Sequence, residues 1–128
     1  MLKKKFLIVF ILVFGFFFAA SSVWAVVNRP TFSVKIRRDR RALNVYFYNQ
    51  KYAKSISYEL IYMGNGLDQG VVGSIYKNEG NSAYRLLLFG TCSKKVCTYH
   101  RNIQNAQLTI RSKLLNGQTL IKRYRIKI

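Results

Sequence analysis

The chain has 128 residues, enough for one domain and too few for two of ordinary size. Lysine and arginine together number 22 against four acidic residues, so the formal net charge is +18, and His100 is the one histidine. Enzymes that rely on paired carboxylates, on a carboxylate-oriented histidine or on a cage of metal ligands need residue types that this chain barely has. The composition therefore argues against an enzyme, and it predicts neither a metal nor a cofactor.

The first 25 residues have the three parts of a secretory signal peptide. Lysines at positions 3–5 precede an apolar segment, and Val23 and Ala25 then occupy the −3 and −1 positions of a cleavage site after Ala25. The alternative is an uncleaved membrane anchor, because residues 6–27 carry no charge and would span roughly 33 Å as a helix. Both interpretations place residues 29–128 outside the cytoplasm, either secreted or held in the cell envelope.

From Thr31 onward, apolar and polar residues alternate with a period of two, which is typical of strands with one buried face. Clusters of Asn, Asp and Gly separate the alternating segments. Glycines in the fourth segment predict a sheet edge, whereas the fifth segment is apolar on both faces and is predicted to be a central strand. About seven strands are expected, over residues 31–38, 42–48, 55–62, 70–76, 83–90, 106–115 and 118–127.

Seven short antiparallel strands in about 100 residues predict an all-β domain, an antiparallel β-sandwich of immunoglobulin or fibronectin-III type. A small barrel is the alternative. The last hairpin, at Asn116-Gly117, has to bring the even-numbered apolar residues of both strands to one face. That requirement favours a three-residue loop, with Gly117 in a left-handed conformation, over a two-residue turn.

Cys92 and Cys97 are the only cysteines, and four residues separate them. In an exported chain an even number of cysteines predicts a disulfide. Closing so short a loop stabilises by about 2 kcal/mol, so the bond would hold a local bend between two strands without tying the sheets together. A zinc site would need two more ligands, of which His100 supplies one at most, and a redox pair is normally more closely spaced.

The cysteine segment, residues 87–100, contains Gly-Thr-Cys with a second cysteine five residues further on. Together with Asn105-Ala106-Gln107-Leu108-Thr109 and the Asn116-Gly117 hairpin, it resembles small exported bacterial β-sandwich proteins of unassigned function. The resemblance covers residues 56–128 approximately and implies the fold and the export. It implies no activity and no binding residues, and fold alone does not fix function.

Five cations fall on the outward-facing parity of the last two predicted strands. If these strands pair, one sheet face carries all five and can bind nucleic acid, an anionic envelope polymer or lipid headgroups. The alternative is a generally basic exported protein whose charge keeps it soluble. The five residues are Arg111, Lys113, Arg123, Arg125 and Lys127.

Several smaller features have a functional interpretation beside an ordinary one. For Tyr46 and Tyr48 the functional interpretation is stacking on bases or sugars, and the ordinary one is packing across strands. The segment 37–41 could clamp an anion or form a solvated turn in which Asp39 offsets its arginine neighbours, and Lys94-Lys95 could form a recognition tip or a plain polar loop. His100 is expected in a loop or at a strand edge.

The resulting hypothesis is a non-enzymatic β-sandwich module at the cell surface or envelope, binding through the basic face or serving a structural or adhesive role. Its partner would be an anionic envelope polymer or another surface protein. The alternative is an extracellular nucleic-acid-binding protein that uses the same face. Membrane contact through residues 6–27 is expected if the leader is not cleaved.

Overall fold

The computed structural model describes residues 28–128, so the predicted signal peptide, anchor and cleavage site at Ala25 lie outside the described residues. The described chain is all-β, with nine strands and two short 3-10 turns. Between residues 28 and 128 there is no helix of the length and apolarity needed to cross a membrane. The elements are β1 (Thr31–Ile36), β2 (Ala42–Tyr48), η1 (Gln50–Tyr52), β3 (Ala53–Gly64), β4 (Leu67–Ile75), η2 (Lys77–Glu79), β5 (Ser82–Leu88), β6 (Gly90–Ser93), β7 (Val96–Tyr99), β8 (Gln104–Leu114) and β9 (Thr119–Ile126).

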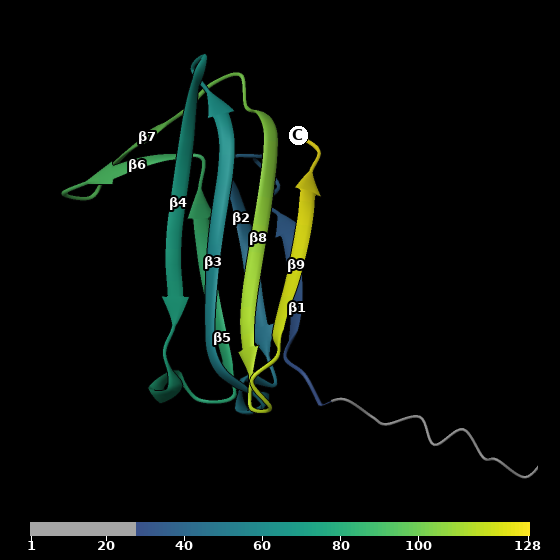
Figure 1. The fold of residues 1–128 in the computed structure, drawn as a ribbon. Coiled ribbons are helices and arrows are strands. Elements are labelled where there is room, and N and C mark those ends of the chain that lie inside the picture. Colours follow the sequence, from purple (N-terminus) through teal and green to yellow (C-terminus); the bar gives the residue numbers. More distant parts are fainter. Residues whose placement is uncertain (1–27) are drawn as a thin grey trace, which may run out of the picture.

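Two antiparallel sheets face each other, which confirms the all-β prediction and its antiparallel sheets (Figure 1). One sheet has three strands in the order β1-β2-β5, and the other has four in the order β4-β3-β8-β9. Strands β6 and β7 form a separate two-stranded sheet that projects at one end of the layers. Each of the seven predicted segments overlaps one strand of the two facing sheets, with ends that differ by up to three residues, whereas β6 and β7 were missed.

The core lies between the two sheets and is built from the inward half of each alternating strand. Leu43, Val45 and Phe47 of β2 have no exposed surface, and neither do Leu60 of β3 and Leu108 of β8. The Phe47 ring lies 5.8 Å from that of Tyr58, so aromatic packing crosses between the sheets. Burial of one face per strand is what the two-residue period requires.

Strand β5 lies at the edge of its sheet, so the prediction of a central strand there was wrong. Its outward residues Tyr84 and Leu86 are 45% and 42% exposed, and Tyr84 makes contacts across the solvent side of the sheet. The Tyr84 ring lies 5.0 Å from that of Tyr46 on β2, and its hydroxyl donates to Asn44 Oδ1. Strand β4 is an edge strand, as its glycines predicted.

The β8–β9 hairpin has the predicted register, in which even-numbered residues pair with even-numbered ones, such as Leu108 with Tyr124. Its loop, residues 115–117, is closed by the Leu114 amide, which donates to the Gln118 carbonyl over 2.8 Å. Gly117 has a φ of +88°, in the left-handed region that favours glycine. The three-residue loop therefore brings the apolar sides of both strands to the core.

The predicted disulfide is present, and it is local. Cys92 and Cys97 lie directly opposite each other across β6 and β7, with their Cα atoms 4.0 Å apart. Gly90 begins this hairpin and pairs with Tyr99. A Cβ on Gly90 would overlap the Thr98 carbonyl oxygen and lie 2.9 Å from the Tyr99 Cα, so the close approach of the two strands depends on glycine.

We expect Gly90→Ala to lower the free energy of unfolding by about 1–3 kcal/mol, because the new methyl group must push two backbones apart. Urea denaturation followed by circular dichroism measures the change. Gly70→Ala is the matched control, since a Cβ at Gly70 meets nothing closer than 3.8 Å. Equal stability of the two variants would show that the hairpin does not need the close approach at Gly90.

A cationic sheet face as the candidate functional site

The alternation along β8 and β9 decides which side chains form the outer face of the four-stranded sheet. Leu108 and Ile110 are fully buried, and Tyr124 and Ile126 are half-buried against the core, so the odd-numbered neighbours point outward. All the predicted cations are exposed there, with Lys127 directly after the end of β9. We call this surface the cationic face; it comprises Arg111, Lys113, Arg123, Arg125 and Lys127.

The register of β8 with β9 keeps these charges from lying directly opposite one another. Arg111 pairs with Ile121, and Arg123 pairs with Thr109. Like charges in directly opposed positions destabilise a sheet, whereas diagonal neighbours are about 7–8 Å apart. Offsetting Arg111 from Arg123 therefore reduces their repulsion and leaves a continuous band of positive charge across two strands.

One carboxylate contacts the cationic face. Glu59 on β3 lies with its Oε2 3.6 Å from Arg111 Nη1, and the two side chains are 35% and 48% exposed. An exposed pair of this kind contributes about 0–1 kcal/mol, so it neutralises little of the face. Sequence reasoning missed Glu59 as a partner. The alternation along β3 indicates that Glu59 points outward, but its position beside Arg111 depends on how β3 pairs with β8. Within residues 28–128 the other four cations make no ion pair.

The arginine turn after β1 packs on the disulfide hairpin, a contact that the sequence did not reveal. The guanidinium carbons of Arg37 and Arg41 lie 5.9 and 5.0 Å from the centre of the Tyr99 ring. Arg37 also donates two hydrogen bonds to Asp39, at 2.8 and 2.6 Å. Hydrogen bonding from Arg37 is the largest cause that lowers the pKa of the Asp39 carboxyl, and the hydrogen bond from the Arg41 backbone amide is the second. Asp39 thus offsets Arg37, as the solvated-turn interpretation predicted.

A polar depression of about 360 Å³ lies beside this contact, and Arg41 and Arg101 line it together with His100 and residues 97–99. The Nδ1 atom of His100 is 2.8 Å from the hydroxyl of Tyr62 on β3, whose pKa is raised by burial. His100 follows β7 directly, in the loop position that was expected. It joins the disulfide hairpin to the four-stranded sheet.

The remaining predicted features lie elsewhere. Lys94 and Lys95 form the exposed tip between β6 and β7, with φ angles of 46° and 70°. Tyr46 and Tyr48 lie on the outer side of the three-stranded sheet, where their parallel rings are 6.4 Å apart. The structure therefore does not bring these tyrosines to the cationic face.

Comparisons of the chain with protein-family models, with curated proteins and with solved structures found no significant match. Within the described residues no group of three or more His, Cys, Asp or Glu side chains is placed to hold a metal ion. The site is accordingly interpreted from its own residues.

The lowered pKa values of two carboxyl groups allow us to predict how the free energy of unfolding depends on pH. The pKa values of Asp39 and Glu79 are lowered in the folded chain, chiefly by hydrogen bonds from Arg37 and Arg85. The two ionised carboxylates therefore stabilise the fold fully at pH values above their pKa values in the unfolded chain. This stabilisation is lost as the pH falls through their lowered pKa values in the folded chain. We expect the free energy of unfolding to fall below about pH 4 to 4.5.

Urea denaturation at several pH values measures this loss. Asp39→Asn with Glu79→Gln should flatten the acid limb, whereas Asp68→Asn, at a carboxylate without an ion pair in the described residues, should leave it steep. An acid limb of unchanged slope in the double variant would contradict the assignment.

Proposed function

We propose that the chain is a non-enzymatic, exported β-sandwich module that binds an anionic polymer of the cell envelope through the cationic face. The observation that carries the proposal is the outer surface of β8 and β9, which holds five exposed cations, of which only Arg111 is paired with a carboxylate among the described residues. Cations gathered on one face raise the local potential, and a polyanion that binds them gains free energy by releasing its counterions.

The composition of the whole domain supports the same partner class. The chain from residue 29 onward holds 19 of the 22 basic residues and all four acids. Three cations of the described residues are paired with carboxylates, which leaves most of the positive charge without a partner. The Cys92–Cys97 disulfide is compatible with an extracytoplasmic location, where anionic envelope polymers are met.

We also infer that the sandwich is of the immunoglobulin or fibronectin-III type. Support comes from a three-stranded sheet of the order β1-β2-β5 facing a four-stranded one of the order β4-β3-β8-β9. The β6–β7 hairpin is then an insertion between the fifth strand and the strand that carries Arg111. Domains of this type serve widely as surface binding modules, although the fold alone does not select the ligand.

Charge reversal on the face tests the proposal. We expect Arg123→Glu with Arg125→Glu to elute from heparin at clearly lower salt, because two attractive contacts become repulsive, with the circular dichroism spectrum unchanged. Arg29→Glu with Lys35→Glu is the control, since these exposed residues precede or belong to β1 of the other sheet. Equal shifts in both pairs would mean that total charge, and not this face, governs retention.

A nucleic acid is the second candidate, favoured by the three arginines on the face, since a guanidinium binds phosphate with two hydrogen bonds. Contact with four or five phosphates of duplex DNA predicts a log–log salt slope of about −3.6 to −4.5. Fluorescence anisotropy at several salt concentrations measures it, and the Arg123→Glu, Arg125→Glu pair should reduce its magnitude by about 1.8. An absence of DNA binding at low salt would eliminate this candidate.

A further inference from the structure

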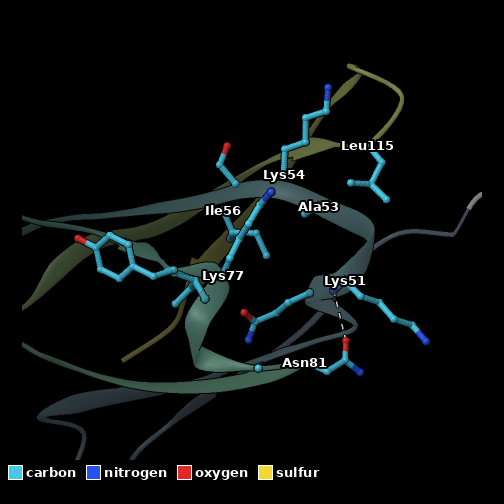
Figure 2. Close-up of a pocket in the computed structure, with 12 residues that line it drawn as sticks. Lys51, Ala53, Lys54, Ile56, Lys77, Asn81 and Leu115 are labelled. Atoms are coloured by element: carbon cyan, nitrogen blue, oxygen red, sulfur yellow. Dashed lines mark hydrogen bonds between the residues drawn. The ribbon is translucent and has the colours of Figure 1, made fainter.

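A cavity of about 330 Å³ opens at one end of the sandwich (Figure 2). The turns η1 and η2 that border it lie at the end opposite the disulfide hairpin (Figure 1). It lies between η1, the beginning of β3 and the segment around η2. Its volume is at the lower end of the range for small-molecule sites, about 300–1,000 Å³. The apolar part of its lining is Ala53, Ile56, Ile75 and Leu115.

The walls of the cavity are held in place by contacts within the protein. Asn81, which follows η2, accepts two hydrogen bonds from backbone N–H groups of η1. Its backbone carbonyl accepts from the Gln50 N–H at 3.2 Å, and its side-chain oxygen accepts from the Lys51 N–H at 3.3 Å (Figure 2). Glu79 holds η2 itself, because it accepts from the Tyr76 amide at 2.8 Å and from Arg85 at 2.7 Å. The cavity is therefore preformed, which lowers the entropic cost of binding.

The charge of the cavity is positive. Lys51, Lys54 and Lys77 line it, no carboxylate does, and none of the three forms an ion pair within residues 28–128. Figure 2 shows Lys77 extending from η2 toward β3, while Lys51 and Lys54 extend outward from the rim. A ligand that fits this distribution has a negative group at the mouth and an apolar part against the isoleucines.

A buried donor without a partner provides an independent indication of a ligand. Gln50 lines the cavity, is 8% exposed, and its buried Nε2 has no hydrogen-bond partner among the described residues. Buried amide donors are almost always satisfied, because leaving one unpaired costs stability. In this conformation the Nε2 atom is closed to solvent, so an oxygen atom of a bound molecule satisfies it only after the side-chain amide of Gln50 turns toward the cavity.

We propose that this cavity binds a small amphiphilic anion, a carboxylate on a short apolar chain. The apolar chain of the ligand lies on Ile56, Ile75 and Leu115, at the open end of the hydrophobic core. Its carboxylate meets Lys77 and the side-chain amide of Gln50, which turns toward the cavity. The volume suits a single short chain and is too small for a whole two-chain lipid. This site lies at the end of the sandwich and does not depend on the function proposed for the cationic face.

The test is isothermal titration calorimetry, in which octanoate is titrated into the protein. The protein is purified after expression in a host that exports it. Lys54→Gln with Lys77→Gln should weaken octanoate binding by about tenfold or more, the effect of losing a charge-assisted contact. Lys94→Gln with Lys95→Gln removes the same charge at the hairpin tip and should leave the affinity unchanged. Acetate, which lacks the apolar chain, and 1-octanol, which lacks the negative charge, should both bind more weakly than octanoate.

No binding of octanoate, or the same loss in both lysine pairs, would overturn the proposal. The lysines of both pairs are exposed, so their replacement leaves the core intact. The Arg123→Glu, Arg125→Glu variant should bind octanoate normally, so failure at the cationic face and failure at the cavity are distinguished.

Gln50→Met provides a second readout, because it removes the unpartnered amide and keeps the length of the side chain. We expect a higher melting temperature together with weaker octanoate binding. Ser112→Ala is the control: its Oγ is also buried without a partner, but Ser112 is fully enclosed and does not line the cavity. It should raise the melting temperature alone, and a Gln50→Met variant that binds octanoate as tightly as the parent would overturn the role of this amide.

Discussion

Burial of one face of β8 and β9, together with the three-residue loop between them, fixes the register of these strands, and the arrangement of the cationic face follows from it. A shift of one residue would turn Leu108 and Ile110 toward solvent, so the hydrophobic effect excludes it, and the loop closed by the Leu114–Gln118 hydrogen bond selects among the alignments that keep both apolar sides buried. In that alignment Arg111 lies opposite Ile121 and Arg123 opposite Thr109, so repulsion is tolerable although the charges share a face. The core therefore positions residues that it never touches.

The four carboxylates are distributed in a way that leaves this face positive. Asp39 and Glu79 each hold a loop, through Arg37 after β1 and through Arg85 on β5, and the hydrogen bonds that lower their pKa values are within the protein. Among residues 28–128, Glu59 is the one side chain that pairs with the cationic face, at a distance where solvent weakens the attraction. Acidic residues thus order the loops of the sandwich, while the outer sheet surface keeps its charge.

Sequence reasoning predicted strands correctly where burial of one face determines the alternation of apolar and polar residues. It failed where residues on the solvent side of a sheet are also apolar. The alternation of Leu43, Val45 and Phe47 predicted a strand with one buried face, and the apolar run that includes Tyr84 and Leu86 wrongly predicted a central strand. The four-residue strands of the disulfide hairpin are too short to show a period. The Arg41–Tyr99 contact was unreadable because it joins segments far apart in the chain.

The part of the chain that the structure describes has two buried side-chain polar atoms without partners, and their surroundings determine how each is interpreted. Ser112 lies on β8 between Ile56 and Leu120 with no exposed surface, so its hydroxyl is enclosed by the core. Gln50 lies at an open end of the same core, beside three lysines and a preformed cavity. Leaving either group unpaired costs stability. The Ser112 hydroxyl is enclosed on all sides, whereas the Gln50 side chain lines a cavity, and the ligand proposed for that cavity would gain free energy by satisfying its amide once the amide turns.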